Sequence, residues 1–504
     1  MMMSSKRQFF CGLTLPLLLA VMSLSATVLA AEDVTSRALK LYEKHHYEEA
    51  TRLLRPQVAA MSDDIQAAAS LALGMSYLGS AMLYRELHKT AQQIELDYLS
   101  QLSKQRAGAN SSYVNFYLGQ AFLEAGKPEQ AATHLRKFAG QVRAQSPFRN
   151  YASVELGLAY SKLKQQDKAE HEWAGLDTNV PELKAALAGA YAVAGKQEYK
   201  PVAMADAALT DMKKSKSVPD EHMLRNLLRA YSKSGATERA LVLLATNDFK
   251  NASHVEELGH SKSIRFYEMS LLGDIAHAHL GAALLYLEQA SRDAKLNGTA
   301  TYFLADAYLH QGNAEAALRS ATNLLSQAKI PAQYRNIAQV HQASALSLSG
   351  RQGEAKAIWL SLAEKSGDDP ALLAEVMLAC ARAKGDCTRL EKLSLDSIEK
   401  GEGRKYFALN AALGRYYLFK KEYPKAVLYM EAGRDKANKN KIEVNDPVML
   451  VALAEAYYRN KKFSENLEIY FELSKQYPAV RQIQEAMQGI YSMEHQSAGD
   501  VKIY

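Results

Sequence analysis

The chain has 504 residues, of which 48% are hydrophobic and 23% are charged. These proportions are ordinary for a folded soluble protein and do not favour intrinsic disorder. Single hydrophobic cores stop growing near about 250–300 residues, so this length predicts several domains or one extended repeat array. The formal net charge is +6 at pH 7, which is too mild to favour a nucleic-acid partner.

Residues 1–30 have the pattern of a secretory signal peptide. Lys6 and Arg7 provide a positive start, and the stretch Cys11–Ala31 that follows carries no charge. The tripeptide Val28-Leu29-Ala30 has the small-residue spacing of a signal-peptidase site, so we expect cleavage after Ala30 and a periplasmic protein. The alternative is an uncleaved membrane anchor, because the uncharged stretch has about the 20 residues needed to span a bilayer.

Two cysteines remain after this cleavage, Cys380 and Cys387. In an oxidising compartment they could form a disulfide across a helix turn. The alternative is that they are two buried small residues that do not meet. Their spacing is not that of a metal or haem site.

Internal repetition organises the rest of the chain. A small residue in one predicted helix is followed twelve positions later by an alanine, which predicts that two antiparallel helices approach closely at that level. An aromatic residue often stands three positions after the first small residue, on the same helix face. Glycine or a polar residue makes the turn between the helices. The pairs with this spacing are Ala38/Ala50, Gly119/Ala131, Gly157/Ala169, Ala305/Ala317, Ala343/Ala355 and Gly414/Ala426.

This pattern resembles the tetratricopeptide repeat family, whose period is about 34 residues. The resemblance covers nearly the whole chain after residue 30. It implies an all-α solenoid of about twelve helix-turn-helix repeats, wound as a right-handed superhelix with a concave inner surface. The repeats are expected near Ala38, Gly74, Gly119, Gly157, Ala188, Leu228, Leu271, Ala305, Ala343, Leu378, Gly414 and Ala454.

We divide the chain into a signal peptide (1–30), N-terminal repeats (31–240), C-terminal repeats (241–477) and a capping helix with a tail (478–504). Four repeats depart from the pattern, near residues 80–110, 195–220, 260–280 and 375–400. The first of them continues into an unbroken helical stretch at Met82–Gln105, and the second has Lys200-Pro201 at the small position, so its second helix should start late.

The sequence shows no pattern of catalytic or metal-binding residues. It contains no phosphate-binding loop, no His-Glu-x-x-His and no Gly-x-Ser-x-Gly. His45 and His46 are adjacent, and His277 and His279 are two apart, so neither pair shares a helix face as metal ligands would. We therefore expect no enzyme activity, no metal and no cofactor.

The first helices of such repeats line the concave groove, and this points to candidate partner-binding residues. Arg225, Arg229 and Lys233 are spaced i, i+4, i+8 and predict a basic stripe that could bind carboxylates of an anionic partner. The alternative is a solvated basic face, partly neutralised by Glu221 and Glu238. Groove positions in other repeats carry aromatic and arginine residues, which are common anchors of interfaces. These further candidates are Tyr113, Phe116, Tyr302 and Arg415.

These features together predict a periplasmic scaffold or adaptor that binds other proteins of the cell envelope. The resemblance also allows an accessory subunit of exopolysaccharide-export or secretion machinery, by analogy of fold alone. A third possibility is a carrier of an extended peptide or glycan in the concave groove. Association with a membrane through an uncleaved first segment remains open.

Overall fold

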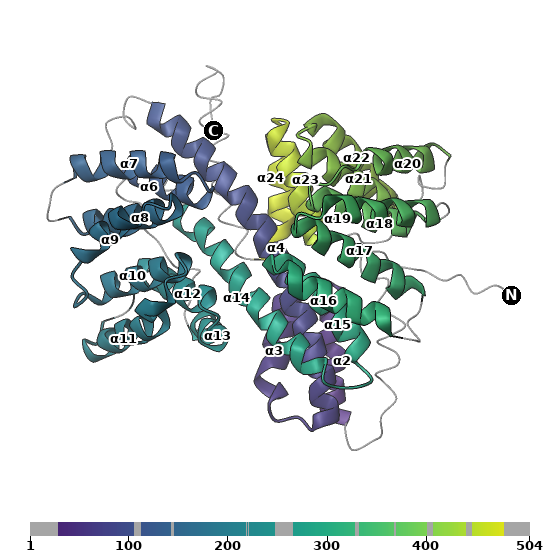
Figure 1. Ribbon diagram of the computed structural model, residues 1–504, viewed down its shortest axis with the longest axis horizontal. Coiled ribbons are helices and arrows are strands. Elements are labelled where there is room, and N and C mark those ends of the chain that lie inside the picture. The colour runs from purple at the N-terminus through teal and green to yellow at the C-terminus, as the bar shows by residue number, and fades with distance from the viewer. Residues whose placement is uncertain are drawn as a thin grey trace. The chain divides into compact units, whose positions relative to one another are not determined.

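The computed structural model describes residues 29–104, 112–142, 146–217, 219, 221–246, 266–327, 332–366, 369–400, 407–439 and 446–477. Secondary structure in these ranges is helical throughout, as Figure 1 shows. The predicted all-α fold is therefore confirmed. The predicted signal peptide, apart from its last two residues, and the predicted capping helix and tail lie outside the described residues.

Two compact units make up the chain, and each is discontinuous in sequence. The first comprises Met1–Leu83 and Ala282–Ile469, and the second comprises Tyr84–Gly281 and Tyr470–Tyr504. The division predicted from the sequence was instead a single one, at residue 240. The boundaries of the units fall inside three helices, the long α4 (Asp63–Lys104) and α14 (Phe266–Ala290) and the last described helix, α24 (Phe463–Ser474), most of which lies in the first unit.

The other helices form antiparallel hairpins, ten of them in the described part of the chain. In the first unit these are α2 (Leu29–Glu43) with α3 (Tyr47–Val58), α15 (Asn297–Gln311) with α16 (Ala314–Ser326), α17 (Ala332–Leu348) with α18 (Gln352–Lys365), α19 (Pro370–Arg382) with α20 (Thr388–Glu399), α21 (Phe407–Phe419) with α22 (Tyr423–Lys439), and α23 (Pro447–Arg459) with α24 (Phe463–Ser474). In the second unit they are α6 (Ser112–Glu124) with α7 (Pro128–Gln141), α8 (Pro147–Lys162) with α9 (Gln166–Ala174), α10 (Pro181–Val193) with α11 (Pro201–Lys214), and α12 (Glu221–Lys233) with α13 (Thr237–Thr246).

Small residues let the two helices of a hairpin touch, as the spacing of twelve predicted. The alanines of the predicted pairs are all almost completely buried, with at most 1% of their surface exposed. In the hairpin of α23 and α24 the residue twelve positions after Ala454 is Asn466, whose side-chain Nδ2 donates a 2.6 Å hydrogen bond to the Ala454 carbonyl. The first helices of consecutive hairpins also contact one another, for example α17 with α19 and α19 with α21. This is the stacking expected of tetratricopeptide repeats.

Two of the predicted repeats are not hairpins. The repeat expected at Gly74 lies within α4, a single unbroken helix of 42 residues. The repeat expected at Leu271 lies within α14, an unbroken helix of 25 residues. Neither stretch has a glycine or proline where the turn would fall, so the helix simply continues. The late start of the helix after Lys200 is confirmed, because a short 3₁₀ helix, η2 (Gln197–Tyr199), precedes α11.

Helix α4 is long and apolar enough to cross a membrane, judged by length and composition alone. Over Ile65–Lys104, 83% of its most apolar window is buried inside the structure. A core helix of a soluble protein has the same properties, so this is weak evidence for a membrane span.

The turn within each of the ten described hairpins contains a residue with positive φ. Glycine occupies this position in five turns, at Gly126, Gly195, Gly235, Gly312 and Gly350. In other hairpin turns the position is held by His45, Lys164, Lys384, Lys421 and Lys461, with φ between 53° and 63°. The left-handed region is unfavourable for residues with a Cβ, so each non-glycine residue here has a conformational cost.

Tyrosines connect consecutive hairpins through their hydroxyl groups. Tyr457 Oη donates a 2.9 Å hydrogen bond to Glu431 on the preceding hairpin, and Lys462 lies over the Tyr457 ring at 5.6 Å. The same hydrogen bond recurs in both units, from Tyr231 to Asp206 (2.9 Å) and from Tyr417 to Glu391 (2.8 Å). Tyr308 makes the equivalent bond (2.6 Å) to Glu288, which lies on the long helix α14. The aromatic position of the repeat thus contributes a buried ring and also a polar contact between repeats.

Replacing Gly414 by alanine should destabilise the hairpin of α21 and α22. A Cβ at this position would lie 2.5 Å from Met430 Cγ and 3.0 Å from the Ala426 carbonyl oxygen, and the latter is backbone that cannot rotate away. We expect a loss of about 1–3 kcal/mol, measured by amide hydrogen exchange in α21 and α22.

The control for this variant is Gly353→Ala, at an exposed position of α18 where a Cβ meets no atom within 4 Å. It should be neutral or slightly stabilising. Equal effects of the two substitutions would show that close helix approach does not limit this fold.

Candidate functional site

The basic stripe predicted on α12 is buried, so the expectation of an exposed basic face is wrong for two of its members. Arg225 is 3% exposed and Arg229 is 8% exposed, while Lys233, one turn further on, is half-buried. All three lie in the second unit. The charges of the arginines therefore need compensation within the chain, because an unpaired buried charge is very costly.

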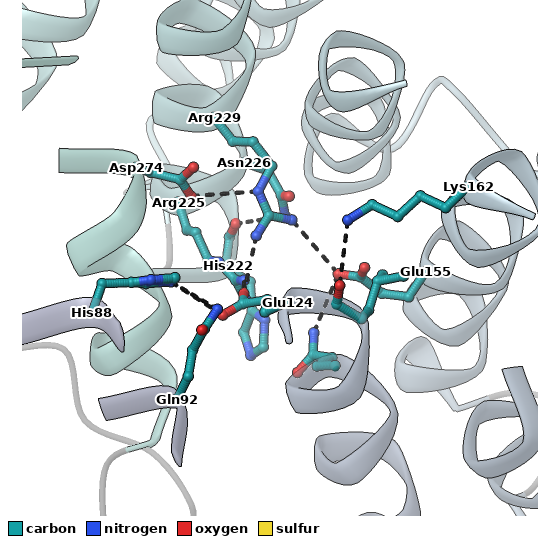
Figure 2. A network of polar contacts seen from close by, with 12 residues as sticks. His88, Gln92, Glu124, Glu155, Lys162, His222, Arg225, Asn226, Arg229 and Asp274 are labelled. Atoms are coloured by element: carbon teal, nitrogen blue, oxygen red, sulfur yellow. Dashed lines mark hydrogen bonds and ion pairs between the residues drawn. The ribbon is translucent and has the colours of Figure 1, made fainter. Parts of the chain in front are cut away.

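Carboxylates from three other helices provide this compensation. Glu124 at the end of α6 accepts hydrogen bonds from both Arg225 Nη2 and Arg229 Nη2, the second at 3.3 Å. Arg229 Nε also donates to Asp274 Oδ2 of α14 at 3.4 Å, and its Nη1 lies 3.9 Å from Glu155 Oε1 of α8. Figure 2 shows the Arg229 guanidinium between Asp274 on one side and the two glutamates on the other.

Two lysines extend the cluster. Lys162 at the end of α8 donates a 3.3 Å hydrogen bond to the Leu123 carbonyl oxygen. Burial lowers the pKa of Lys162, and the Arg229 charge lowers it further. Burial also lowers the pKa of Lys233, which Asp274 partly offsets. In the other direction, Arg229 and Lys233 hold the pKa of Asp274 below its ordinary value despite its burial.

Histidines and a further glutamate surround these ion pairs. His88 of α4 lies 3.8 Å from Glu124 Oε2, and its pKa is lowered by burial. Burial also lowers the pKa of His222 and of His277 to about 4, so both are neutral at pH 7. Burial raises the pKa of Glu95 well above its ordinary value, and the nearby Glu124 adds to this.

A small pocket opens beside the cluster, between α6, α8, α10 and α12. Glu155, Arg225 and His222 line it, together with Gln120, Tyr151, Val154, Ala186 and Asn226. The space open to a water-sized sphere is about 10 Å³, which is about what one water molecule requires. The cluster therefore joins helices together, and the pocket beside it has room for a water molecule.

The aromatic candidates of the same unit pack internally. Phe116 is completely buried, so its prediction as a groove-facing anchor is wrong. Its ring lies 5.2 Å from that of Phe138 and 5.5 Å from that of Phe148. Tyr113 is half-buried and packs on the same two phenylalanines, at 5.6 Å and 5.3 Å. The stack continues from Phe148 to His222 at 6.0 Å and so reaches the rim of the polar cluster.

The remaining groove candidates belong to the first unit. Arg415 of α21 is 4% exposed, so it is not an accessible anchor either. Tyr302 of α15 is half-buried, with its ring 5.2 Å from His341 and 4.8 Å from Phe303. The first helices of this unit also carry internal polar contacts, such as the one between His310 Nε2 and Asp306 Oδ1 at 3.6 Å. Positions counted from the small residue therefore face the interior more often than the sequence suggests.

The structure joins Cys380 and Cys387 by a disulfide, with their Cα atoms 6.0 Å apart. It links the last turn of α19 to the residue that precedes α20, and both cysteines are buried. Among the described residues, no group of three or more His, Cys, Asp or Glu side chains is arranged to hold a metal.

These hairpins define the class of fold, an all-helical array of hairpins stacked as in tetratricopeptide repeats. The chain is similar to the crystal structure of yeast Tom70, with 11% identity, a TM-score of 0.31 and coverage of 94% of this chain and 97% of that one. It is also similar to the APC/C hetero-tetramer Cut9-Hcn1 (14% identity, 94% and 86% covered, TM-score 0.27) and to the P58(IPK) TPR domain (14%, 86% and 98%, 0.19). No family model and no curated protein matches the chain. Similarity at this level carries no argument about function.

Replacing Arg229 by methionine should destabilise the second unit by about 3–5 kcal/mol, because it leaves the buried Asp274 without its guanidinium partner and leaves Glu124 with Arg225 alone. The chain has two tryptophans, Trp173 in the second unit and Trp359 in the first. Urea unfolding followed by Trp173 fluorescence, in a Trp359→Phe background, therefore reports on the second unit.

The matched control is Arg239→Met. Arg239 is in the same unit and pairs with Asp206 at 3.1 Å, but its side chain is 56% exposed. Its loss should cost at most about 1 kcal/mol. A cost for Arg229→Met as small as that of the control would contradict a structural role for the buried cluster.

Replacing Glu95 by glutamine should stabilise the second unit at pH 7.5. The folded-state pKa of Glu95 is raised, so the folded chain is destabilised by this group as the pH rises above the unfolded value near 4.5. The difference between variant and parent should be absent below about pH 4, where the carboxyl is protonated in both states. Urea unfolding of both proteins at pH 4 and 7.5, with the same fluorescence readout, measures it. A constant difference at both pH values would refute this explanation.

Proposed function

We propose that the protein is an exported scaffold that binds other proteins in the periplasm. The observation that carries the proposal is the set of ten hairpins in the described residues, in each unit of which consecutive hairpins contact one another, for example α10 with α12 and α19 with α21. Such arrays expose ridges of side chains along their length, and they bind partners through these extended surfaces.

Two features support export. The first 30 residues have the order of a signal peptide, with a basic start, an uncharged stretch and a small residue at Ala30. The disulfide between Cys380 and Cys387 is of a kind that persists in oxidising compartments such as the periplasm. Cleavage after Ala30 would remove only the first two residues of α2, which begins at Leu29.

The carrier alternative has less support than the scaffold. A carrier would need an open groove along the first helices, but in the second unit the arginines expected there are buried against Glu124 and Asp274. Outer surfaces and hairpin edges are therefore the better candidates for partner contact. A role in exopolysaccharide export or secretion would be one case of the scaffold, and the identity of the partners decides it.

Crosslinking in intact cells, followed by affinity purification and mass spectrometry, tests the scaffold. We expect a small and reproducible set of envelope proteins, enriched over those captured by an unrelated periplasmic bait of equal abundance. The intact mass of the purified chain should correspond to a start at Ala31. No enrichment over the control bait would overturn the scaffold, and a chain that retains residues 1–30 would overturn cleavage.

A further inference from the structure

The hairpin turns of the first unit lie along one edge of its array. Consecutive first helices are in contact from α17 through α19 and α21 to α23, so these helices run side by side in the same direction. Each ends at the turn into its own second helix. The turns therefore follow one another along one edge, which we call the turn edge: residues 348–352, 382–387, 419–422 and 459–462.

The turn edge is strongly basic. Its four turns contain two acidic residues, Asp386 and Glu422, and eight basic ones: Arg351, Arg382, Lys384, Lys420, Lys421, Arg459, Lys461 and Lys462. Some of these are paired, as Arg351 is with Glu354 and Lys420 with Glu422. Within the described part of the chain, Lys384, Lys421 and Lys461 make no ion pair, and all three are exposed.

These three lysines recur at one structural position in three successive hairpins. Each has positive φ, at 53°, 63° and 59° respectively. The equivalent position in the two preceding hairpins is Gly312 and Gly350, which adopt this conformation without a steric penalty. Lysine is thus less favourable than glycine for the backbone of the turn. A non-glycine residue kept in such a strained conformation suggests that its side chain has a function.

Apolar side chains accompany the lysines on the same edge. Leu348 is the last residue of α17 and is 50% exposed, and Phe419 is the last residue of α21 and is 46% exposed. These side chains are exposed and lie at the helix ends and turns, outside the packed helix faces. Cations that flank exposed apolar groups are the combination that binds anionic bilayers at the headgroup level.

We propose that the turn edge of the first unit binds the surface of an anionic phospholipid membrane. Lys384, Lys421 and Lys461 contact the lipid phosphates, and Phe419 and Leu348 enter the headgroup layer. A soluble polyanion would satisfy the lysines but would leave the two apolar side chains in water, and this favours the lipid surface. The membrane contact is additional to the proposed binding of proteins and does not depend on it.

Co-sedimentation of the purified full chain with vesicles tests the proposal. The readout is the ratio of binding to vesicles with about one third phosphatidylglycerol over binding to pure phosphatidylcholine vesicles. An apolar first segment, if retained, inserts into both kinds and cancels in this ratio. The triple variant Lys384→Asn, Lys421→Asn, Lys461→Asn should reduce the ratio about 100-fold, because each cation near an anionic surface contributes about fivefold to binding. Asparagine tolerates positive φ, so the turns stay intact.

The control variant is Lys365→Gln, Lys392→Gln, Lys400→Gln, which removes the same charge from exposed positions outside the turn edge: Lys365 at the end of α18, Lys392 on α20 and Lys400 directly after α20. It should leave the ratio within about twofold of the parent. Phe419→Ser should weaken binding to anionic vesicles also at high salt, where charge attraction is screened. The proposal is overturned if the parent binds both vesicle types equally, if both triple variants lose binding equally, or if the parent binds soluble polyphosphate but no vesicle.

Discussion

The close approach of two helices at one level is the constraint on which the rest of the structure depends. In the six predicted pairs it brings together two residues no larger than alanine, one on each helix, and the twelve-residue spacing places them opposite one another. Where glycine is used, the opposing side chain occupies the space of the missing Cβ, as Trp173 does at Gly157 and Met430 at Gly414. This contact fixes how the helices of a hairpin meet, and so it also fixes where the tyrosine three residues later can reach the preceding hairpin.

Charge compensation inside the second unit follows from that packing. Once α12 is held between neighbouring hairpins, its arginines have no access to bulk water, and their stripe is tolerable only because Glu124, Glu155 and Asp274 converge on it. The acids come from positions 101, 74 and 45 residues away from the arginines they contact. A stripe of like charges on one helix can therefore indicate either of two things: a buried network of ion pairs or an exposed binding face.

The hairpin turns are free of these constraints, and they differ in another way. Each needs one residue in the left-handed region, and the chain uses glycine in some turns and lysine in others. Lysine at Lys384, Lys421 and Lys461 lowers the stability of the turn but places a charge at the tip of each hairpin. Packing thus determines the helix faces, while the tips are available for contacts outside the chain.

The sequence by itself determined the all-helical fold, the spacing of the hairpins and the late start of α11, because these depend on local signals such as Ala50, Gly312 and Lys200-Pro201. It did not show that α4 and α14 are single helices, because the absence of a turn signal is harder to recognise than its presence. It also misplaced Arg225, Phe116 and Arg415, which are buried. Whether a groove position is accessible to a partner depends on how consecutive repeats pack together and on which side chains from distant parts of the chain contact it. Only the tertiary structure decides this, since no local pattern encodes contacts between residues as far apart as Glu124 and Arg225.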